Sequence, residues 1–363
     1  MVMNMKISVY AICKNEEMFV NRWMESMSEA DEVYVLDIGS TDNTVELLKQ
    51  NGAIVHEASI IPWRFDVARN KSLQLVSKDT DICVCTDLDE VFTPGWRKAL
   101  ESVWTDSTDC VSYKYVWSFD EDGKEKTFFN IEKIHKRIGF QWVHPVHEVL
   151  QYIGNKQKRT VYTDKIILNH FPDNNKSRAQ YLELLELSVT ESPDDDRNMH
   201  YLGREYYFRG MWEKSIETLK KHLQLKSANW RDERCASMRY IAMCYINLEK
   251  YTDAQKWYEI AIKEAPYLRE PYIEYAMLEY RNKNWNKVIH LLQDAIKIID
   301  RKQTYITQSY CWDSTPYDLL SNAYYNIGEI QNALIYAQYA LSLDENNERL
   351  NNNVRILKRL IGD

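Results

Sequence analysis

Four segments in the second half of the chain repeat one pattern, and this repetition restricts the fold more than any other feature of the sequence. Each segment has apolar residues at helical spacing, a short turn, and then an aromatic or aliphatic residue that begins a second helical stretch. These first residues of the second stretch are Trp212, Tyr251, Trp285 and Ile330. Helix pairs that recur in this way bury their apolar faces by stacking, so residues 178–363 are predicted to form an all-helical solenoid.

The repeat lengths indicate one class of solenoid. The four positions are separated by 39, 34 and 45 residues, and the middle spacing matches the tetratricopeptide period of about 34 residues. An insertion around QTYITQSYCWD lengthens the last interval, and the final helix, NERLNNNVRILKRLIG, is predicted to cap the array. We expect Trp212, Tyr251 and Trp285 to pack between helices rather than to bind a ligand.

The first half of the chain has a different pattern, in which short apolar runs alternate with helical ones. The apolar runs include KISVYAIC, EVYVLD, AIVHEA and DICVCTD. The helical patterns between them begin at about Glu16, Asp42 and Phe65. This alternation is typical of a parallel sheet with helices on both faces.

Two further strands are predicted around a charged turn at residues 120–123, with DCVSYKYVWS before it and KTFFNIEKI after it. Strand-like runs become rare after Pro172. We therefore predict an α/β domain at residues 1–177 and the helical domain at residues 178–363. A chain of 363 residues agrees with two domains of about 100 to 200 residues each.

Composition and charge exclude several classes of protein. Hydrophobic residues make up 45% and charged residues 28% of the chain, which excludes general disorder. The formal net charge of −8 lacks the basic excess of a non-specific nucleic-acid binder. The sequence contains no run of 18 apolar residues and does not start with a signal-peptide pattern. We therefore expect a cytoplasmic protein with no membrane span. The seven cysteines include no CxxC pair and are expected to be buried free thiols.

Carboxylates follow the predicted strand DICVCTD directly. Asp87, Asp89 and Glu90 lie at its carboxyl end, which is where ligands collect in an open α/β sheet. Hard oxygen ligands at such a place suit Mg²⁺ or Mn²⁺, which would neutralise the charge of a departing diphosphate. The alternative is a solvated acidic turn.

The first two predicted strands also end in polar residues. Asn15, Glu16 and Glu17 follow the first strand, and Asp37 lies at the tip of the second, before a Gly-Ser-Thr-Asp turn. These residues should share one edge of the sheet with Asp87, where a carboxylate can accept hydrogen bonds from a ribose or a base. Asp42 is more simply explained as the cap of the following helix.

Four motifs in this order resemble a known family. AICKNEE, VLDIGSTDNT, WRFDVARNKSL and CTDLDE are together similar to the family-2 glycosyltransferases of GT-A fold, specifically the subgroup with a C-terminal tetratricopeptide array. The resemblance implies a GT-A domain with a mixed, Rossmann-like sheet. It further implies inverting transfer of a sugar from a nucleotide diphosphate, usually a uridine one, with Mn²⁺ or Mg²⁺ as the metal.

The resemblance also implies roles for individual residues. Asp37 corresponds to the carboxylate that reads the base, and Asn15 with Glu17 to the group near base and ribose. Arg69, with Asp66 beside it, corresponds to the basic residue near the diphosphate. Asp87 and Asp89 correspond to the metal-binding DxD pair, with Asp87 also on the donor. TDLDE stands where many relatives have LDADE, so both carboxylates are kept while Thr86 and Leu88 differ.

A later motif carries the candidate catalytic residues. GFQWVHPVHEVL contains Trp142, His147 and Glu148, and the resemblance places a tryptophan and a His-Glu pair near the acceptor. Inverting transfer needs a base for the acceptor proton, and Glu148 is the candidate, with His147 beside it. The alternative is that Glu148 only orients His147 or Arg137.

His170, in IILNHFPDN, resembles a late histidine of the family that completes the metal or diphosphate site. The alternative is a loop histidine that satisfies its neighbours.

The expected partners are a UDP-sugar donor and a protein or peptide acceptor held by the helical repeats, and a second copy of the chain is a further candidate partner. A cell-envelope glycan or lipid-linked acceptor is the first alternative, and no nucleic acid is expected. A nucleotidyltransferase is expected to have a glycine-rich phosphate loop after the first strand, but AICKNEE contains no glycine. A non-catalytic scaffold would not need both Asp87 and Asp89.

Overall fold

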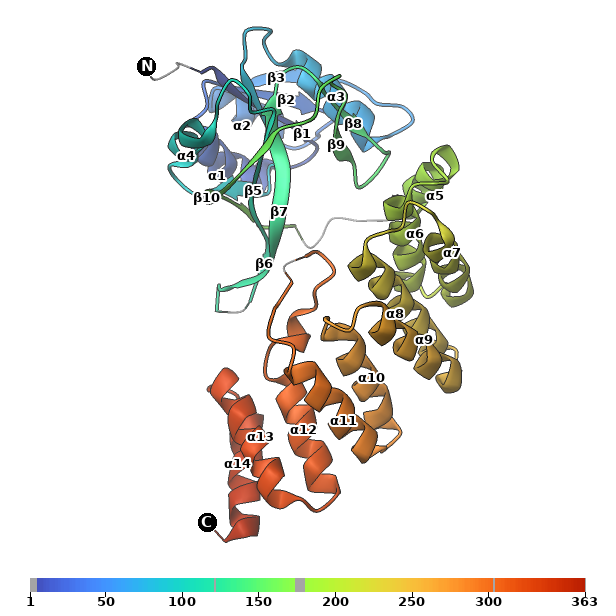
Figure 1. The fold of residues 1–363 in the computed structure, drawn as a ribbon. Coiled ribbons are helices and arrows are strands. Elements are labelled where there is room, and N and C mark those ends of the chain that lie inside the picture. The colour runs from blue at the N-terminus through green and yellow to red at the C-terminus, as the bar shows by residue number, and fades with distance from the viewer. Residues whose placement is uncertain (1–4, 121, 174–179, 303, 363) are drawn as a thin grey trace. The chain divides into compact units, whose positions relative to one another are not determined.

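The computed structural model describes residues 5–120, 122–173, 180–302 and 304–362. The chain divides into two compact units, Met1–Ser188 and Val189–Asp363 (Figure 1). This division falls within helix α5 (Tyr181–Glu191). The boundary predicted between residues 177 and 178 lies outside the described residues.

The first unit is built on a mixed sheet whose strand order is β3-β2-β1-β4-β7-β6-β10-β5. The strands are β1 (Ile7–Cys13), β2 (Glu32–Asp37), β3 (Ile54–Glu57), β4 (Ile82–Cys85), β5 (Glu90–Phe92), β6 (Cys110–Phe119), β7 (Glu125–Lys136) and β10 (Thr160–His170). The first four in the order are parallel, as the alternating pattern predicts. A separate antiparallel pair contains β8 (Phe140–Val143) and β9 (Val149–Tyr152).

Strands β6 and β7 form the antiparallel hairpin predicted around residues 120–123. Strand β7 also pairs antiparallel with β4, with Val84 opposite Ile134. Continuing this register by one residue brings Lys133 beside the end of β4. Strand β10 lies parallel to β6, and β5 lies antiparallel to β10 with Glu90 opposite His170.

Helices cover both faces of the sheet because successive side chains of a strand point to opposite faces. These helices are α1 (Glu17–Met27), α2 (Thr44–Gln50), α3 (Phe65–Leu75) and α4 (Trp96–Val103). Val9 of β1 belongs to the core that also contains Trp23 of α1 and Leu100 of α4. Tyr10, the next residue, belongs to the core that contains Leu73 of α3. Strand β1 is buried along its whole length.

The strand register determines where the functional loops emerge. In the parallel pairing, Cys13 lies opposite Asp37 and Tyr10 lies opposite Cys85. The loops that follow β1, β2 and β4 therefore leave the sheet at the same edge, as the sequence predicts.

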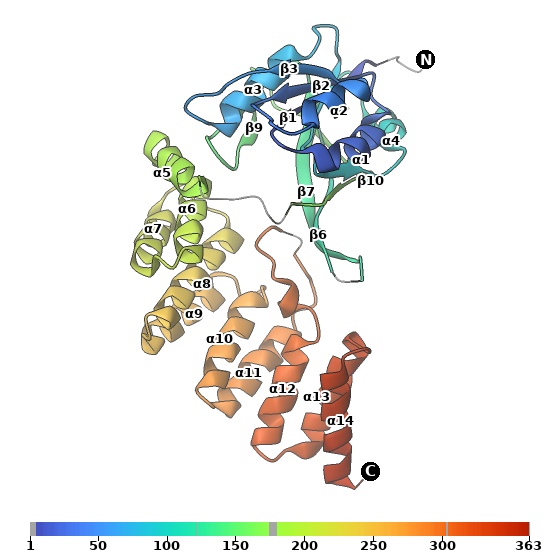
Figure 2. The ribbon, with the colours of Figure 1, turned by 180° about the vertical axis from the view of Figure 1, so that it is seen from behind.

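The second unit is a series of helices with a single-turn 3-10 helix in the insertion at Ser309–Cys311 (Figure 2). The helices are α6 (Asp196–Phe208), α7 (Trp212–Gln224), α8 (Arg231–Asn247), α9 (Tyr251–Glu264), α10 (Glu270–Arg281), α11 (Trp285–Ile296), α12 (Thr315–Asn326), α13 (Ile330–Leu343) and α14 (Glu348–Ile361). Each helix packs against the next one along the chain. The predicted fold class, an α/β GT-A domain followed by a tetratricopeptide-like solenoid, is confirmed.

The four residues identified from the repeat are the first residues of α7, α9, α11 and α13. Trp212 and Trp285 pack against the cores between helices, as expected. Tyr251 differs from the expectation because it is 45% exposed. Its helix instead buries Ala254, Tyr258 and Ala261, so the first residue of α9 is free to lie at the surface.

The seven cysteines are buried free thiols, as predicted. Within the described ranges, no helix is long and apolar enough to cross a bilayer.

Candidate active site

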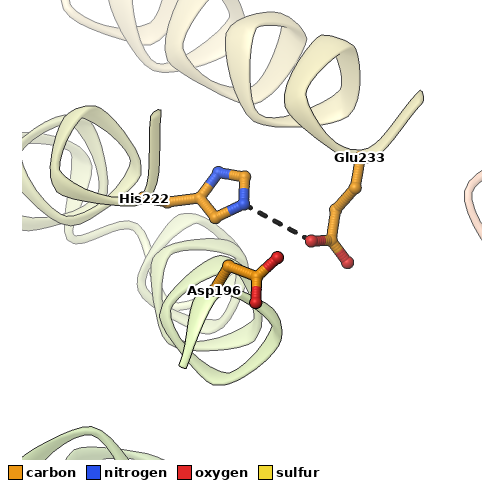
Figure 3. A group of neighbouring side chains, drawn as sticks. All are labelled: Asp196, His222 and Glu233. Atoms are coloured by element: carbon orange, nitrogen blue, oxygen red, sulfur yellow. Dashed lines mark ion pairs between the residues drawn. The ribbon is translucent and has the colours of Figure 1, made fainter. Parts of the chain in front are cut away.

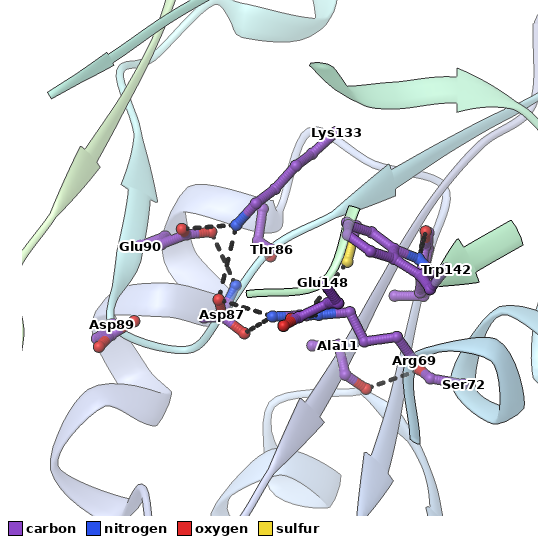
Figure 4. A network of polar contacts seen from close by, with 12 residues as sticks. Ala11, Arg69, Ser72, Thr86, Asp87, Asp89, Glu90, Lys133, Trp142 and Glu148 are labelled. Atoms are coloured by element: carbon purple, nitrogen blue, oxygen red, sulfur yellow. Dashed lines mark hydrogen bonds and ion pairs between the residues drawn. The ribbon is translucent and has the colours of Figure 1, made fainter. Parts of the chain in front are cut away.

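Arg69 of α3 is the centre of a buried network at the end of β4. The residue is 4% exposed, and its Nη2 donates to both oxygens of Asp87, at 2.8 and 3.0 Å. Its Nε donates to Oε1 of Glu148 at 2.5 Å (Figure 4). A guanidinium is costly to bury unless carboxylates pair with it, so α3, the β4 end and the residue before β9 are held together at this point.

Lys133 of β7 brings a second positive charge to the same carboxylates. Its Nζ lies 2.9 Å from Oε1 of Glu90 and 3.6 Å from Oδ2 of Asp87 (Figure 4). Burial alone would raise the pKa of Asp87, but the charges of Arg69 and Lys133 outweigh burial and hold that pKa well below its usual range. Asp87 is therefore ionised.

No motif in the sequence identifies Lys133 as a site residue. It lies inside a strand rather than in a motif, and only the pairing of β7 with β4 brings it to Asp87. The alternative of a solvated acidic turn does not describe Glu90, which is 1% exposed and also accepts from the backbone N–H of Asp87 at 2.9 Å.

Asp89 lies apart from Arg69 (Figure 4) and faces His170 instead. Nε2 of His170 is 3.4 Å from Oδ2 of Asp89. Burial would lower the pKa of His170, but the hydrogen bond and charge of Asp89 outweigh it and raise that pKa. The imidazole stacks on Trp117 with ring centres 4.4 Å apart, and its Nδ1 lies 3.1 Å from the Trp117 carbonyl oxygen.

Asp89 and His170 are thus brought together as predicted, whereas both oxygens of Asp87 face Arg69. The donors at Asp89 and His170 are a carboxylate oxygen and an imidazole nitrogen. This pair suits Mn²⁺ better than Mg²⁺, which favours an all-oxygen shell.

Asp37 holds the turn that follows its strand. It is 2% exposed, and its carboxylate accepts from the N–H groups of Gly39 and Ser40 at 2.9 and 3.0 Å. The Ser40 hydroxyl donates to it at 2.5 Å.

Asn15 and Glu17 hold the rest of this loop. Oδ1 of Asn15 accepts from the Thr41 N–H at 2.8 Å, and Oε2 of Glu17 accepts from the Asn43 N–H at 3.0 Å. The N-cap of α2 is Asn43 and not Asp42, but Asp42, one residue earlier, accepts from the N–H of Thr44, the first residue of α2, at 3.0 Å. The structure therefore brings Asn15, Glu17 and the β2 turn together.

Asp66 is buried in the first turn of α3 and forms an ion pair with Arg64, with Nη2 to Oδ2 at 2.8 Å. It is on the same helix as Arg69, but its charge is paired with a different arginine.

Glu148 is connected to Arg69 and not to Arg137. Arg137 donates to the carbonyls of Val76 and Ser77, so the alternative that Glu148 orients Arg137 is wrong. His147 has a left-handed backbone, with φ of 51°, and its ring lies 5.8 Å from that of Tyr181.

Trp142 of β8 completes the wall around Arg69. Its Nε1 donates to the Tyr10 hydroxyl at 2.9 Å, and the Arg69 guanidinium carbon lies 5.2 Å from the centre of the indole ring. The tryptophan and Glu148 therefore both lie at the arginine that Asp87 contacts (Figure 4).

Comparison with known proteins shows what the chain is similar to. Residues 8–168 match the model of glycosyl transferase family 2. The chain is 27% identical over 116 residues to the lipopolysaccharide core biosynthesis glycosyltransferase LpsC of Rhizobium meliloti (strain 1021), covering 31% of this chain and 43% of LpsC. It is 23% identical over 270 residues to the SPbeta prophage-derived glycosyltransferase SunS of Bacillus subtilis (strain 168), covering 70% of this chain and 62% of SunS. The chain thus spans roughly half the length of these relatives.

Among solved structures, the chain is similar to the MamA protein, with a TM-score of 0.36, 17% identity and coverage of 45% of this chain and 81% of MamA. It is also similar to a thermophilic TPR protein of Thermus thermophilus. That match has a TM-score of 0.35, 16% identity and coverage of 48% of this chain and 88% of the thermophilic protein.

Proposed function

We propose that the protein, whose residues 8–168 match the model of glycosyl transferase family 2, is a metal-dependent inverting glycosyltransferase that moves a sugar from a UDP-sugar to a protein or peptide side chain. The observation that carries the proposal is the network in which Arg69 joins Asp87 to Glu148, beside the pair of Asp89 and His170. The grouping of these residues at the end of β4 supports a common site for donor and acceptor there.

Asp89 and His170 would hold the divalent cation, with Asp87 beside them. A bound cation would neutralise the diphosphate as it leaves the sugar. Arg69 supports the same end of the donor through its positive charge, and its two ion pairs hold the guanidinium in one orientation.

Glu148 is the proposed base. It takes the proton of the acceptor group as that group bonds to the anomeric carbon and the bond from this carbon to the diphosphate oxygen breaks. The bond from Arg69 Nε to Glu148 Oε1 positions the carboxylate. His147 is proposed to position the acceptor beside it.

The base of the nucleotide is proposed to be uracil, read by the loop that Asn15, Glu17 and Asp37 hold. A carboxylate can accept from uracil N3–H, whereas neutral cytosine has no donor at N3. Because Asp37 already accepts from the turn at residues 39 and 40, competition between UDP and CDP for a bound probe is decisive. Equal displacement would mean that Asp37 only shapes the turn.

The acceptor is proposed to be a polypeptide because a tethered docking surface raises the local concentration of its ligand, and the helical unit offers such a surface. The similarity to LpsC, a lipopolysaccharide core biosynthesis glycosyltransferase, supports a cell-envelope glycan as the second candidate.

Two experiments test the proposal. A thermal-shift screen with Mn²⁺ and UDP, GDP, CDP or dTDP should show metal-dependent stabilisation by UDP, and a protein that responds to no nucleotide would be a scaffold. The second experiment compares donor hydrolysis with transfer in the full chain and in residues 1–188. Hydrolysis should survive in the shorter protein while transfer to a polypeptide falls. If residues 1–188 retain both donor hydrolysis and transfer, the helical unit does not bind the acceptor.

A further inference from the structure

Three side chains that can bind a metal converge in the helical unit, away from every residue used above. Asp196 begins α6, His222 lies in the last turn of α7, and Glu233 lies in the first turn of α8. One ligand atom from each lies within 4.8 Å of the other two. The side chains point toward one another from three helices (Figure 3). In the part of the chain that the structure describes, no other group of three meets this criterion.

His222 points a nitrogen into this cluster with no hydrogen bond to it. The residue is 0% exposed, and its Nε2 has no hydrogen-bond partner among the described residues. Its nearest charged neighbour is Oε1 of Glu233, at 3.4 Å, which is an ion-pair distance when the imidazole is protonated (Figure 3). A buried polar atom without a hydrogen bond is costly, so this nitrogen needs an explanation.

The surroundings of His222 allow Nε2 to carry a lone pair. Its Nδ1 lies 2.9 Å from Oγ of Ser237, and the same Oγ lies 2.7 Å from Nδ1 of His200. If Nδ1 of His222 donates to Ser237, the serine hydroxyl can donate to His200. Nε2 of His222 is then an acceptor that faces two carboxylates. A second hydrogen bond that orients the ring in this way is typical of metal-bound histidines.

We propose that Asp196, His222 and Glu233 bind a divalent transition-metal ion of the zinc class. This inference is independent of the glycosyltransferase proposal, because none of the three residues belongs to the first unit.

The spacing of the His222–Glu233 pair and the charge of the cluster fit this ion. Two ligands about 2.1 Å from a tetrahedral metal lie about 3.4 Å apart, and Nε2 of His222 is 3.4 Å from Oε1 of Glu233. Two carboxylates balance the charge of a divalent ion. An imidazole in the set favours zinc over magnesium or calcium. Oε2 of Glu233 accepts from the Tyr305 hydroxyl, so this carboxylate offers one oxygen, and the metal keeps a position for water.

Helix dipoles explain part of the arrangement without a metal. Asp196 and Glu233 lie in first turns and His222 in a last turn, where these charges are favoured. Arg197 and Arg204 contact the Tyr201 ring, at 4.8 and 4.4 Å from its centre, and this ring stacks on Tyr305, whose hydroxyl donates to Glu233. Neither the helix dipoles nor these arginines give Nε2 of His222 a close hydrogen bond, and its 3.4 Å contact with Oε1 of Glu233 is the contact that a metal ion would replace. In the metal site, the ion would join the first two helix pairs of the solenoid.

The test uses the full chain, freed of metal with EDTA, and ZnCl₂ as the only probe. Asp196 is partly exposed, so Asp196→Asn should fold normally. Asp194→Asn is the matched control, because Asp194 is an exposed carboxylate two residues away. Zinc that binds elsewhere, including the first unit, affects both variants equally. Calorimetry should show Zn²⁺ binding at least tenfold weaker for D196N than for D194N, and the zinc-dependent rise in melting temperature should be lost only in D196N.

Equal zinc binding by the two variants would overturn the proposal, as would a wild-type chain that takes up no zinc. In either case His222 and Glu233 would form a buried ion pair only. His222→Gln serves as the second variant, with circular dichroism as the check on helix content. X-ray absorption of the zinc-loaded wild type should show one imidazole and oxygen ligands, and a spectrum without imidazole would also contradict the site.

Discussion

Each unit of the protein buries one arginine against a carboxylate. The two ion pairs differ in whether the carboxylate is accessible to solvent, which distinguishes a candidate ligand site from a purely structural contact. Arg69 in the first unit and Arg239 in the second are both 4% exposed. Arg239 Nε donates to Oε2 of Glu274 at 2.9 Å, and the Tyr310 hydroxyl donates to Oε1 of Glu274 at 2.7 Å. The side chain of Glu274 is 5% exposed, whereas that of Asp87, the partner of Arg69, is 36% exposed.

The difference shows that burial of a charge does not by itself indicate function. Both arginines need paired carboxylates because an unpaired buried charge is costly. Only at Arg69 does the paired carboxylate also reach solvent, so only there can a ligand approach the network. At Arg239 the Tyr310 hydroxyl covers the paired carboxylate. The ion pair of Arg239 and Glu274 therefore serves to connect α8 and α10.

The largest effect is expected from Arg239→Met. This variant leaves Glu274 buried without its cation, which should lower the free energy of unfolding by about 3 to 5 kcal/mol. Urea denaturation followed by circular dichroism measures this loss. A double variant with Glu274→Met should recover much of it, because no charge then stays buried. A loss below about 1 kcal/mol would mean that the pair is open to water.

Arg69→Met should be milder for stability and severe for activity. Asp87 can regain water, so we expect a loss of about 2 kcal/mol in the free energy of unfolding. Donor hydrolysis should fall by about a hundredfold or more because the charge near the diphosphate is lost. Arg69→Lys keeps the charge but cannot hydrogen-bond to Asp87 and Glu148 at the same time in the way that a guanidinium does. Its rate of donor hydrolysis should lie between those of Arg69→Met and the wild type. Donor hydrolysis at the wild-type rate in Arg69→Met would mean that Arg69, like Arg239, has a structural role only.

Asp89→Asn should abolish the metal-linked response without affecting the fold. Two carboxylates beside a diphosphate repel it unless a cation is present. We expect donor hydrolysis to fall by about a hundredfold and UDP to lose its Mn²⁺-dependent stabilisation, while the melting temperature of the free protein stays near that of the wild type. Asp164→Asn, an exposed carboxylate on β10, is the control. UDP affinity that EDTA does not change would contradict the metal.

Acid should weaken both units through one buried histidine in each. Burial lowers the pKa of His135 to about 4 and that of His200 to about 3, whereas an unfolded histidine titrates near 6.5. Below pH 6.5 the unfolded chain binds protons that the folded chain does not, so stability falls as pH falls. Each histidine should contribute a loss of about 2 kcal/mol at pH 5.

Urea denaturation between pH 7 and pH 5 measures this dependence. His135→Gln should reduce the pH dependence of the first unit alone, and His200→Gln that of the second. His290, whose side chain is 74% exposed, is the control position. If the unfolding free energy changes with pH equally in the His135 and His290 variants, His135 must be accessible to water in the folded protein.

The features that depend on local pattern could be predicted from the sequence. Apolar spacing located α7, α9, α11 and α13 to the residue, because a helix begins where its own turn and its own apolar stripe begin. The hairpin of β6 and β7 and the carboxylates at the end of β4 followed for the same reason. Asp42 and Asp37 also bond within a few residues of themselves.

The pairing of charges that are distant in the sequence depends on the tertiary fold. Arg69 and Glu148 are 79 positions apart, and Lys133 reaches Asp87 only because β7 inserts antiparallel beside β4. The convergence of Asp196, His222 and Glu233 likewise depends on how three helices stack. Local periodicity determines which face of an element is buried, but the identity of a charge's partner depends on sheet order and helix stacking, which the whole chain must fold to establish.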